Sequence, residues 1–153
     1  MERILGLDLG SKNIGIALSD PLKITSQGLT TLKRISRAKD LSQLRELVRE
    51  HDVREGVVGL PLNMDGSLGP QAEKVTREAE RLRSELGIPV ILWDERLTTV
   101  EAERTLLQAD VSRSKRKKVI DKLAAQIILQ GYLDRLSAER NKQDHNAGST
   151  GLC

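Results

Sequence analysis

The sequence has almost no aromatic side chains and only one cysteine. Among its 153 residues there is one Trp, one Tyr and no Phe. Proteins that bind single strands by base stacking need several aromatic rings, so this chain cannot build such a platform. Because the single cysteine is Cys153, an intramolecular disulfide and a cysteine-based zinc site are both excluded. The fold must rest on packing, and any nucleic-acid contact on the backbone, on shape or on metal.

Long apolar runs are also missing. No stretch approaches the roughly 20 apolar residues that cross a bilayer, and residues 1–5 lack the apolar core of a signal peptide. We therefore expect a cytoplasmic protein that does not contact a membrane. The length fits one domain. The formal net charge of +3 is too small to identify a nucleic-acid binder by itself.

Apolar runs predict five strands. They cover residues 3–9, 14–19, 27–33, 55–60 and 90–93. The short connection at 10–13 predicts a hairpin between the first two strands, and the third continues the antiparallel run. The fourth is uniformly apolar, which suits a central parallel strand covered on both faces.

Apolar positions at helical spacing predict four helices. They cover residues 40–50, 70–86, about 98–109 and about 116–138. Asp40 or Ser42 lies near the start of the first helix, and Gly87 ends the second. This element order predicts an α/β domain with a mixed five-stranded sheet, its first three strands antiparallel, flanked by helices. We expect the domain to span residues 1–138 and the polar tail, 139–153, to be disordered.

Three acidic residues occupy unusual positions. Asp8 lies inside an apolar strand, Glu95 follows the end of another, and Asp121 has small apolar neighbours on its helix face. A carboxylate in such surroundings needs protonation, a basic partner or a metal ion. If the three meet, Mg²⁺ or Mn²⁺ relieves their repulsion best. Two such ions about 4 Å apart can stabilise the attacking and leaving oxygens in phosphodiester cleavage, so a meeting of the three carboxylates would allow metal-dependent nuclease chemistry.

Local pairings are the alternative for each of these carboxylates. Pattern alone leaves these pairings open: Asp8 with the turn at 10–13, Glu95 with Arg96 or Arg104, and Asp121 with Lys117 or Lys118.

Several basic residues near these positions are candidates for binding substrate phosphate. They are Lys12, Arg96, Arg113, Lys115, Arg116, Lys117 and Lys118. The last five open a helix, where positive charge opposes the macrodipole, so a phosphate-backbone contact would explain their placement. The alternatives are a solvated lysine at 12, an ion pair of Arg96 with Asp94 or Glu101, and a solvated helix face.

Four separated segments together resemble the YqgF/RuvX family. They are residues 6–17, 57–67, 94–99 and 121–130, and the likeness extends over about 3–136. The resemblance implies a ribonuclease H-like fold similar to the RuvC Holliday-junction resolvases. By this resemblance Asp8 is the acid on the first strand, Glu95 the acid after the last sheet strand, and Asp121 the acid on the C-terminal helix.

The resemblance also implies the expected function. Family members are described as resolvases and as nucleases that mature the 5′ end of the 16S ribosomal RNA precursor. We therefore expect a hydrolase of phosphodiester bonds, acting on ribosomal RNA precursor with two Mg²⁺ or Mn²⁺ ions. The alternatives are a resolvase of branched DNA, a non-catalytic RNA-binding module, and an ATP-binding domain like those of sugar kinases and actin. Resolvases act as dimers, whereas trimming needs one site, and no residue decides between monomer and homodimer.

Overall fold

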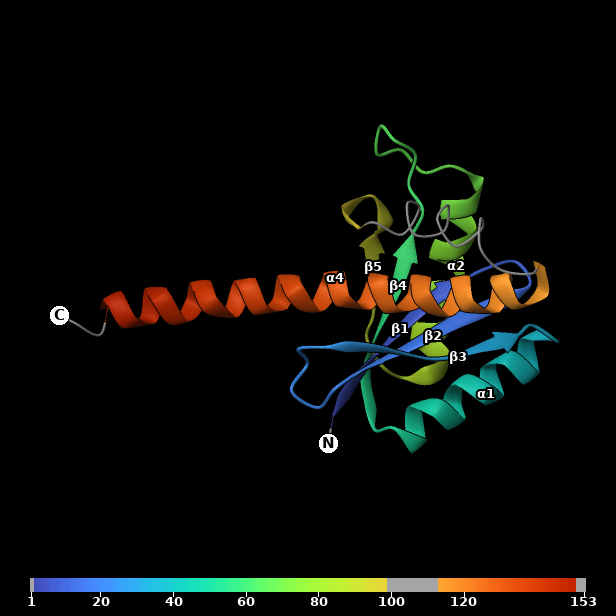
Figure 1. The fold of residues 1–153 in the computed structure, drawn as a ribbon, viewed down its shortest axis with the longest axis horizontal. Helices are drawn as coiled ribbons and strands as arrows, with labels where there is room; N and C mark the ends of the chain where they lie inside the picture. The colour runs from blue at the N-terminus through green and yellow to red at the C-terminus, as the bar shows by residue number, and fades with distance from the viewer. Residues whose placement is uncertain (1, 99–112, 151–153) are drawn as a thin grey trace.

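The structure, a computed structural model, describes residues 2–98 and 113–150, with side chains over 2–98 and 119–142. Its centre is a five-stranded sheet with the order β3-β2-β1-β4-β5 (Figure 1). The strands are β1 (Arg3–Leu9), β2 (Asn13–Ser19), β3 (Ser26–Lys33), β4 (Val53–Leu60) and β5 (Val90–Asp94). The first three pair antiparallel, while β4 pairs parallel with β1 and β5. The predicted mixed sheet is confirmed.

Helices cover both faces of the sheet. Leu5, Leu7 and Leu9 of β1 pack with residues of α1 (Arg37–Glu50) and α2 (Pro70–Leu86). Ile4, on the opposite face of the same strand, packs under α4 (Arg113–Thr150). Because side chains alternate along a strand, each even-numbered residue of β1 faces α4. The predicted helix at about 98–109 lies outside the described residues.

Two helix ends differ from the sequence prediction. Ser36 caps α1, since its side chain accepts a hydrogen bond from the Lys39 N–H at 3.2 Å, so the helix starts before Asp40 and Ser42. The helix α4 continues to Thr150 rather than ending near 138. The first residues beyond 138 include the good helix formers Glu139, Arg140, Lys142 and Gln143. The division of the chain into domain and tail at 138 stays a prediction.

The chain's two aromatic rings lie where α4 meets β5. Trp93 of β5 and Tyr132 of α4 pack edge to face, with ring centroids 6.0 Å apart and an interplanar angle of 72°. The Arg135 guanidinium lies 5.9 Å from the Trp93 ring. Tyr132 also donates a hydrogen bond to Glu55 of β4. These contacts attach the middle of α4 to strands β4 and β5, at the opposite edge of the sheet from β3.

Candidate active site

Helix α4 approaches the sheet closely because several of the residues beneath it are glycines. Four neighbouring strands each place a glycine under the helix: Gly28, Gly15, Gly6 and Gly59. A Cβ atom at Gly15 would lie 1.9 Å from the Asp121 carbonyl oxygen, and one at Gly6 would lie 2.7 Å from Leu129 Cβ. Helix α4 packs along this row of glycines. Their close contacts with the helix fix the position of Asp121 over the sheet.

Asp8 lies at the centre of this arrangement. It is only 7% exposed and shares a face of β1 with Gly6, so its side chain is directed toward α4. Its partner in the antiparallel pair with β2 is Gly15, the residue on which the Asp121 backbone rests. Cross-strand partners lie about 4.5–5.5 Å apart. The strand pairing and the helix contact therefore bring Asp121 next to the position of Asp8.

Glu95 approaches Asp8 from the other side. Strand β5 ends at Asp94, and Glu95 begins the short 3-10 helix η1 (Glu95–Leu97). The Glu95 Oε1 atom lies 2.6 Å from the position of a Cβ atom at Gly59 on β4. Leu7 of β1 pairs with Val58, so one position further along these parallel strands Gly59 comes beside Asp8. The three predicted acidic residues thus share one face and one region of the sheet.

The donor chemistry of this region suits a hard divalent cation. Carboxylate oxygens are the ligands that Mg²⁺ and Mn²⁺ prefer, and Mg²⁺ usually takes only one or two of them, completing its shell with water and substrate phosphate. Among the described residues, no three His, Cys, Asp or Glu side chains are grouped closely enough to hold an ion. Asp8, Glu95 and Asp121 each take part in a polar interaction. Shared metal binding by all three therefore stays a prediction.

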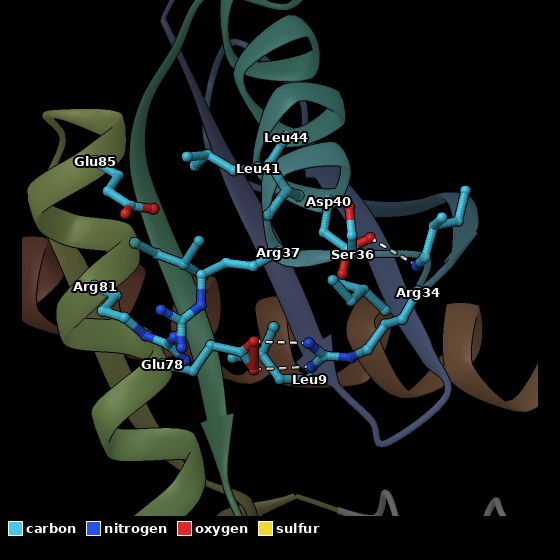
Figure 2. Close-up of a pocket in the computed structure, with 13 residues that line it drawn as sticks. Leu9, Arg34, Ser36, Arg37, Asp40, Leu41, Leu44, Glu78, Arg81 and Glu85 are labelled. Carbon is cyan, nitrogen blue, oxygen red and sulfur yellow. Dashed lines mark hydrogen bonds and ion pairs between the residues drawn. The ribbon is translucent and has the colours of Figure 1, made fainter.

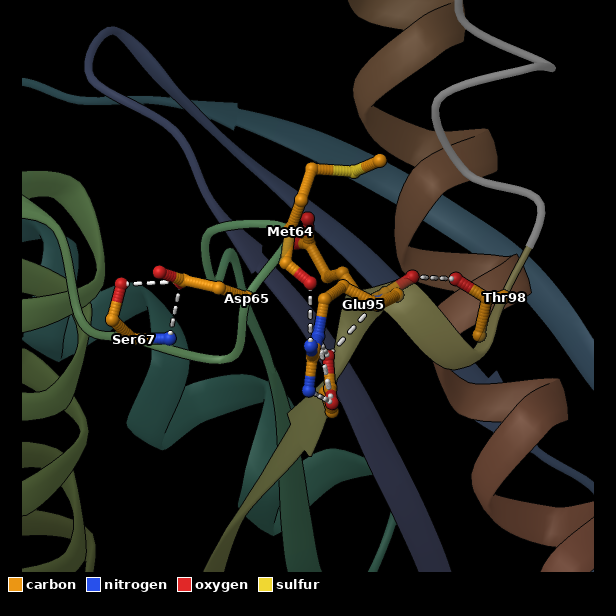
Figure 3. A network of polar contacts seen from close by, with 7 residues as sticks. Met64, Asp65, Ser67, Glu95 and Thr98 are labelled. Carbon is orange, nitrogen blue, oxygen red and sulfur yellow. Dashed lines mark hydrogen bonds and ion pairs between the residues drawn. The ribbon is translucent and has the colours of Figure 1, made fainter.

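Arg96 forms an ion pair that the sequence offered as an alternative. Its guanidinium bonds both carboxylate oxygens of Asp94, with Nη2 2.7 Å from Oδ2. This side-chain hydrogen bonding holds the pKa of Asp94 below its ordinary value. The same guanidinium donates to the Met64 carbonyl oxygen at 3.1 Å (Figure 3). Arg96 thus ties the loop after β4 to η1, and its contact with phosphate stays a prediction.

The loop held by Arg96, residues 62–67, is a turn closed by its own hydrogen bonds. Asp65 accepts hydrogen bonds from the backbone and the hydroxyl of Ser67, at 2.9 and 2.6 Å. Gly66 adopts a φ of 88°, which favours glycine, and packs against the Arg96 guanidinium. Met64 at the tip is 95% exposed. Figure 3 shows Asp65 and Ser67 of this turn on one side of the view and Glu95 with Thr98 on the other.

The remaining predicted phosphate contacts are only partly described. Lys12 is exposed on the turn between β1 and β2. The side chains of the basic cluster, Arg113, Lys115, Arg116, Lys117 and Lys118, lie outside the described side chains, although their backbone forms the first turns of α4. All of these phosphate contacts stay predictions.

Sequence reasoning missed the glycines that seat the helix. A glycine inside a strand often marks a close approach of another backbone, so Gly15 and Gly59 carried a usable signal. A glycine in a strand does not indicate, however, which helix or strand packs against it. The contact of Arg96 with Met64 had no signal, because it joins residues 32 positions apart through a backbone oxygen.

The fold is that of an α/β domain of the RuvC type. RuvC of T. thermophilus, solved in complex with a Holliday junction substrate, matches 86% of this chain and 93% of its own, with a TM-score of 0.52 and 14% identity. At that identity the likeness concerns the fold alone. A family model, RuvX, described as Holliday junction resolvase, matches residues 2–135. The chain belongs to the RuvX family.

Curated relatives agree with this family. A protein of Moorella thermoacetica, described as "Putative pre-16S rRNA nuclease", is 63% identical over 134 residues, covering 88% of this chain and 96% of that protein. A Clostridioides difficile protein with the same description is 58% identical, covering 86% and 94%. No described helix is long and apolar enough to cross a membrane.

Proposed function

We propose that this protein is a metal-dependent nuclease that hydrolyses phosphodiester bonds in the precursor of 16S ribosomal RNA, in the cytoplasm. One observation carries the proposal. The Asp121 backbone rests on Gly15, a Glu95 carboxylate oxygen covers Gly59, and Asp8 lies on the strand between them. Carboxylates gathered over neighbouring strands on one face of a sheet can bind the divalent ions used in phosphodiester cleavage, and this placement supports the proposal.

The chain's own residues hold and orient the reacting groups. Asp8, buried on the central strand, would be one metal ligand, and Glu95 of η1 and Asp121 of α4 lie over glycines of the two neighbouring strands, β4 and β2. When bound, two Mg²⁺ or Mn²⁺ ions supply Lewis acidity to the phosphate and lower the pKa of the attacking water. Since the site sits under α4, these charges act in partial exclusion of solvent, where electrostatic stabilisation is strongest.

The choice of substrate follows the relatives. The names of proteins at 63% and 58% identity refer to the 16S ribosomal RNA precursor. The family description instead refers to Holliday junctions, and a branched DNA substrate is the second candidate for this reason. Trimming of RNA needs one active site per cut, whereas symmetrical cutting of a junction needs two, so the first reading suits a monomer and the second a homodimer.

A side-by-side assay tests the proposal. The purified protein is incubated with Mn²⁺, Mg²⁺ or EDTA and with a 16S precursor fragment, single-stranded DNA or a four-way junction. We expect cleavage of the RNA that stops in EDTA. Preferential cleavage of the junction would move the function to the second candidate. Cleavage of none of them in either metal would contradict the nuclease assignment.

A further inference from the structure

A recess lies on the face of the sheet opposite to α4, between the β1–β2 turn and α2. It has a volume of about 360 Å³. The residues that matter for its chemistry are Ser11, Arg34, Lys74, Arg77, Glu78 and Arg81. Four of these six are basic and one is acidic, so they sum to +3, as large as the formal net charge of the whole chain.

The single acidic side chain among them is already neutralised. Arg34 binds both carboxylate oxygens of Glu78, at 2.7 and 2.8 Å, and its Nε donates to the Gly10 carbonyl oxygen at 2.6 Å. Hydrogen bonding to Glu78 raises the pKa of Arg34. Figure 2 shows this pair from the neighbouring pocket, with Arg81 close by on α2. The ion pair forms one side of the recess, and both carboxylate oxygens of Glu78 accept hydrogen bonds from Arg34.

Three cations on α2 are left without such a partner. Within the described part of the chain, Lys74, Arg77 and Arg81 form no hydrogen bond or ion pair through their side chains. They follow one another at helical spacing of three and four residues, so they line one side of α2. Lys74 and Arg77 are exposed. Like charges at this spacing destabilise an isolated helix, so an anion along this side would relieve the repulsion.

The recess lies on the other face of the sheet from the acidic region, and the β1–β2 turn, which follows Asp8, forms part of its rim. Gly10 and Ser11, which line it, follow two and three residues after Asp8, and Lys12 is exposed on the same turn. A strand leaving the acidic region across this turn passes Lys12 and then meets the three cations of α2. The only aromatic rings, Trp93 and Tyr132, pack against each other under α4. Contact with a polynucleotide here therefore relies on charge and not on stacking.

We propose that this recess binds the phosphate backbone of the nucleic-acid strand next to the cleavage site, through Lys74, Arg77 and Arg81. The identity of the ligand rests on the proposed nuclease function. The contact is independent of sequence, because it involves phosphates alone. It gives a protein of small net charge a local, oriented site for a polyanion.

Salt-dependent binding tests this proposal. The variant Lys74→Gln/Arg77→Gln/Arg81→Gln is compared with Lys39→Gln/Arg49→Gln/Lys142→Gln, which loses the same charge from exposed positions elsewhere. The probe is a fluorescein-labelled, single-stranded RNA of 12 nucleotides, in EDTA so that it is not cleaved. Each phosphate contact on a single strand contributes about 0.7 to the slope of log affinity against log salt, so losing three lowers the slope by about 2. With equal affinities at 1 M salt, that is about a hundredfold loss at 0.1 M.

The control separates local contacts from overall charge. We expect the control variant to keep the wild-type slope. An unchanged slope in the recess variant, or an equal decrease in both, would overturn the proposal. Because Lys74 and Arg77 are exposed, we expect both variants to melt at the wild-type temperature. If the triple variant proves unstable, the single variant Arg77→Gln replaces it. We expect that variant to lower the slope by about 0.7.

The same design separates this inference from the nuclease assignment. Binding in EDTA does not depend on hydrolysis. Loss of slope in the recess variant, without cleavage by the wild type, would support the recess and contradict the nuclease. Cleavage by the wild type, with the same slope in the wild type and the recess variant, would support the nuclease and contradict the recess.

Discussion

Gly15 and Asp121 touch through their backbones: a Cβ atom on the glycine would lie 1.9 Å from the aspartate carbonyl oxygen. Contacts that short do not occur between real Cβ atoms and backbone, so either the strand or the helix must move if the glycine is replaced. The same glycine pairs with Asp8 across the sheet. One residue without a side chain therefore sets both the seating of α4 and the approach of two proposed catalytic carboxylates.

Replacing Gly15 with alanine should destabilise the protein. Overpacking of a close contact costs roughly 1–3 kcal/mol, and here the obstructing atom is backbone, which cannot rotate away. The matched control is Gly56→Ala on β4, where the nearest atom to the new Cβ is a Val90 methyl group at 3.7 Å. That change should alter the free energy of unfolding by less than about 1 kcal/mol. Urea unfolding measures both, and equal stability of the two variants would contradict the seating of α4.

Replacing Asp8 with asparagine should abolish hydrolysis while keeping the fold. The substitution preserves shape and removes the charge at the centre of the acidic region. We expect the rate with Mg²⁺ or Mn²⁺ to fall by at least about a hundredfold, the scale seen when one preorganised electrostatic group is lost. Glu46→Gln, on the exposed side of α1, is the control and should retain activity. Full activity of Asp8→Asn would remove this residue from the mechanism.

Replacing Arg96 with glutamine should change how stability depends on pH. The pKa of Asp94 is lowered by its bonds to Arg96, so the ion pair stabilises the fold above the ordinary carboxyl pKa of about 3.9 and is lost as pH falls below it. The stability difference between wild type and variant should be constant from pH 5 to 7 and shrink below about pH 4. The pair lies near the surface, so the difference is small. A difference that grows on acidification would contradict this assignment.

The single tyrosine, Tyr132, should ionise at a higher pH than a free tyrosine. Burial, followed by the hydrogen bond to Glu55, raises the pKa of Tyr132 well above its ordinary value of about 10. Absorbance at 295 nm should therefore show little ionisation at pH 10 in the folded protein. In Glu55→Gln the midpoint should move down, toward but not reaching 10, because burial remains. A wild-type midpoint near 10 would show that Tyr132 of α4 is not buried against the sheet beside Glu55.

The fold could be predicted where burial leaves a pattern. Strands covered on both faces need continuous apolar runs, so β1 was found at its exact bounds and the others within about two residues. The start of α1 was missed because its first turn is polar. Apolar spacing begins only at Leu41, while the cap is Ser36. The end of α4 was missed because residues 139–150 are polar in sequence and offer no apolar spacing from which a helix could be predicted.

The candidate site was predictable only in part. Asp8 was visible because a charge inside an apolar strand needs a reason. The pair of Arg96 with Asp94 was available as an alternative because the partners are two residues apart. Arg34 and Glu78 are 44 positions apart and meet only through the packing of α2 on the sheet, so no local pattern could join them. The recess beside that pair is likewise a product of tertiary structure.

The placement of Trp93 and Tyr132 at the junction of α4 and the sheet turns the protein into its own optical reporter. No other aromatic ring exists in the chain to add background. Emission from this ring pair therefore follows a single event, the docking of the helix that carries Asp121. Spectroscopy without any attached dye can thus watch the assembly of the acidic region during folding, on adding metal, or on adding nucleic acid.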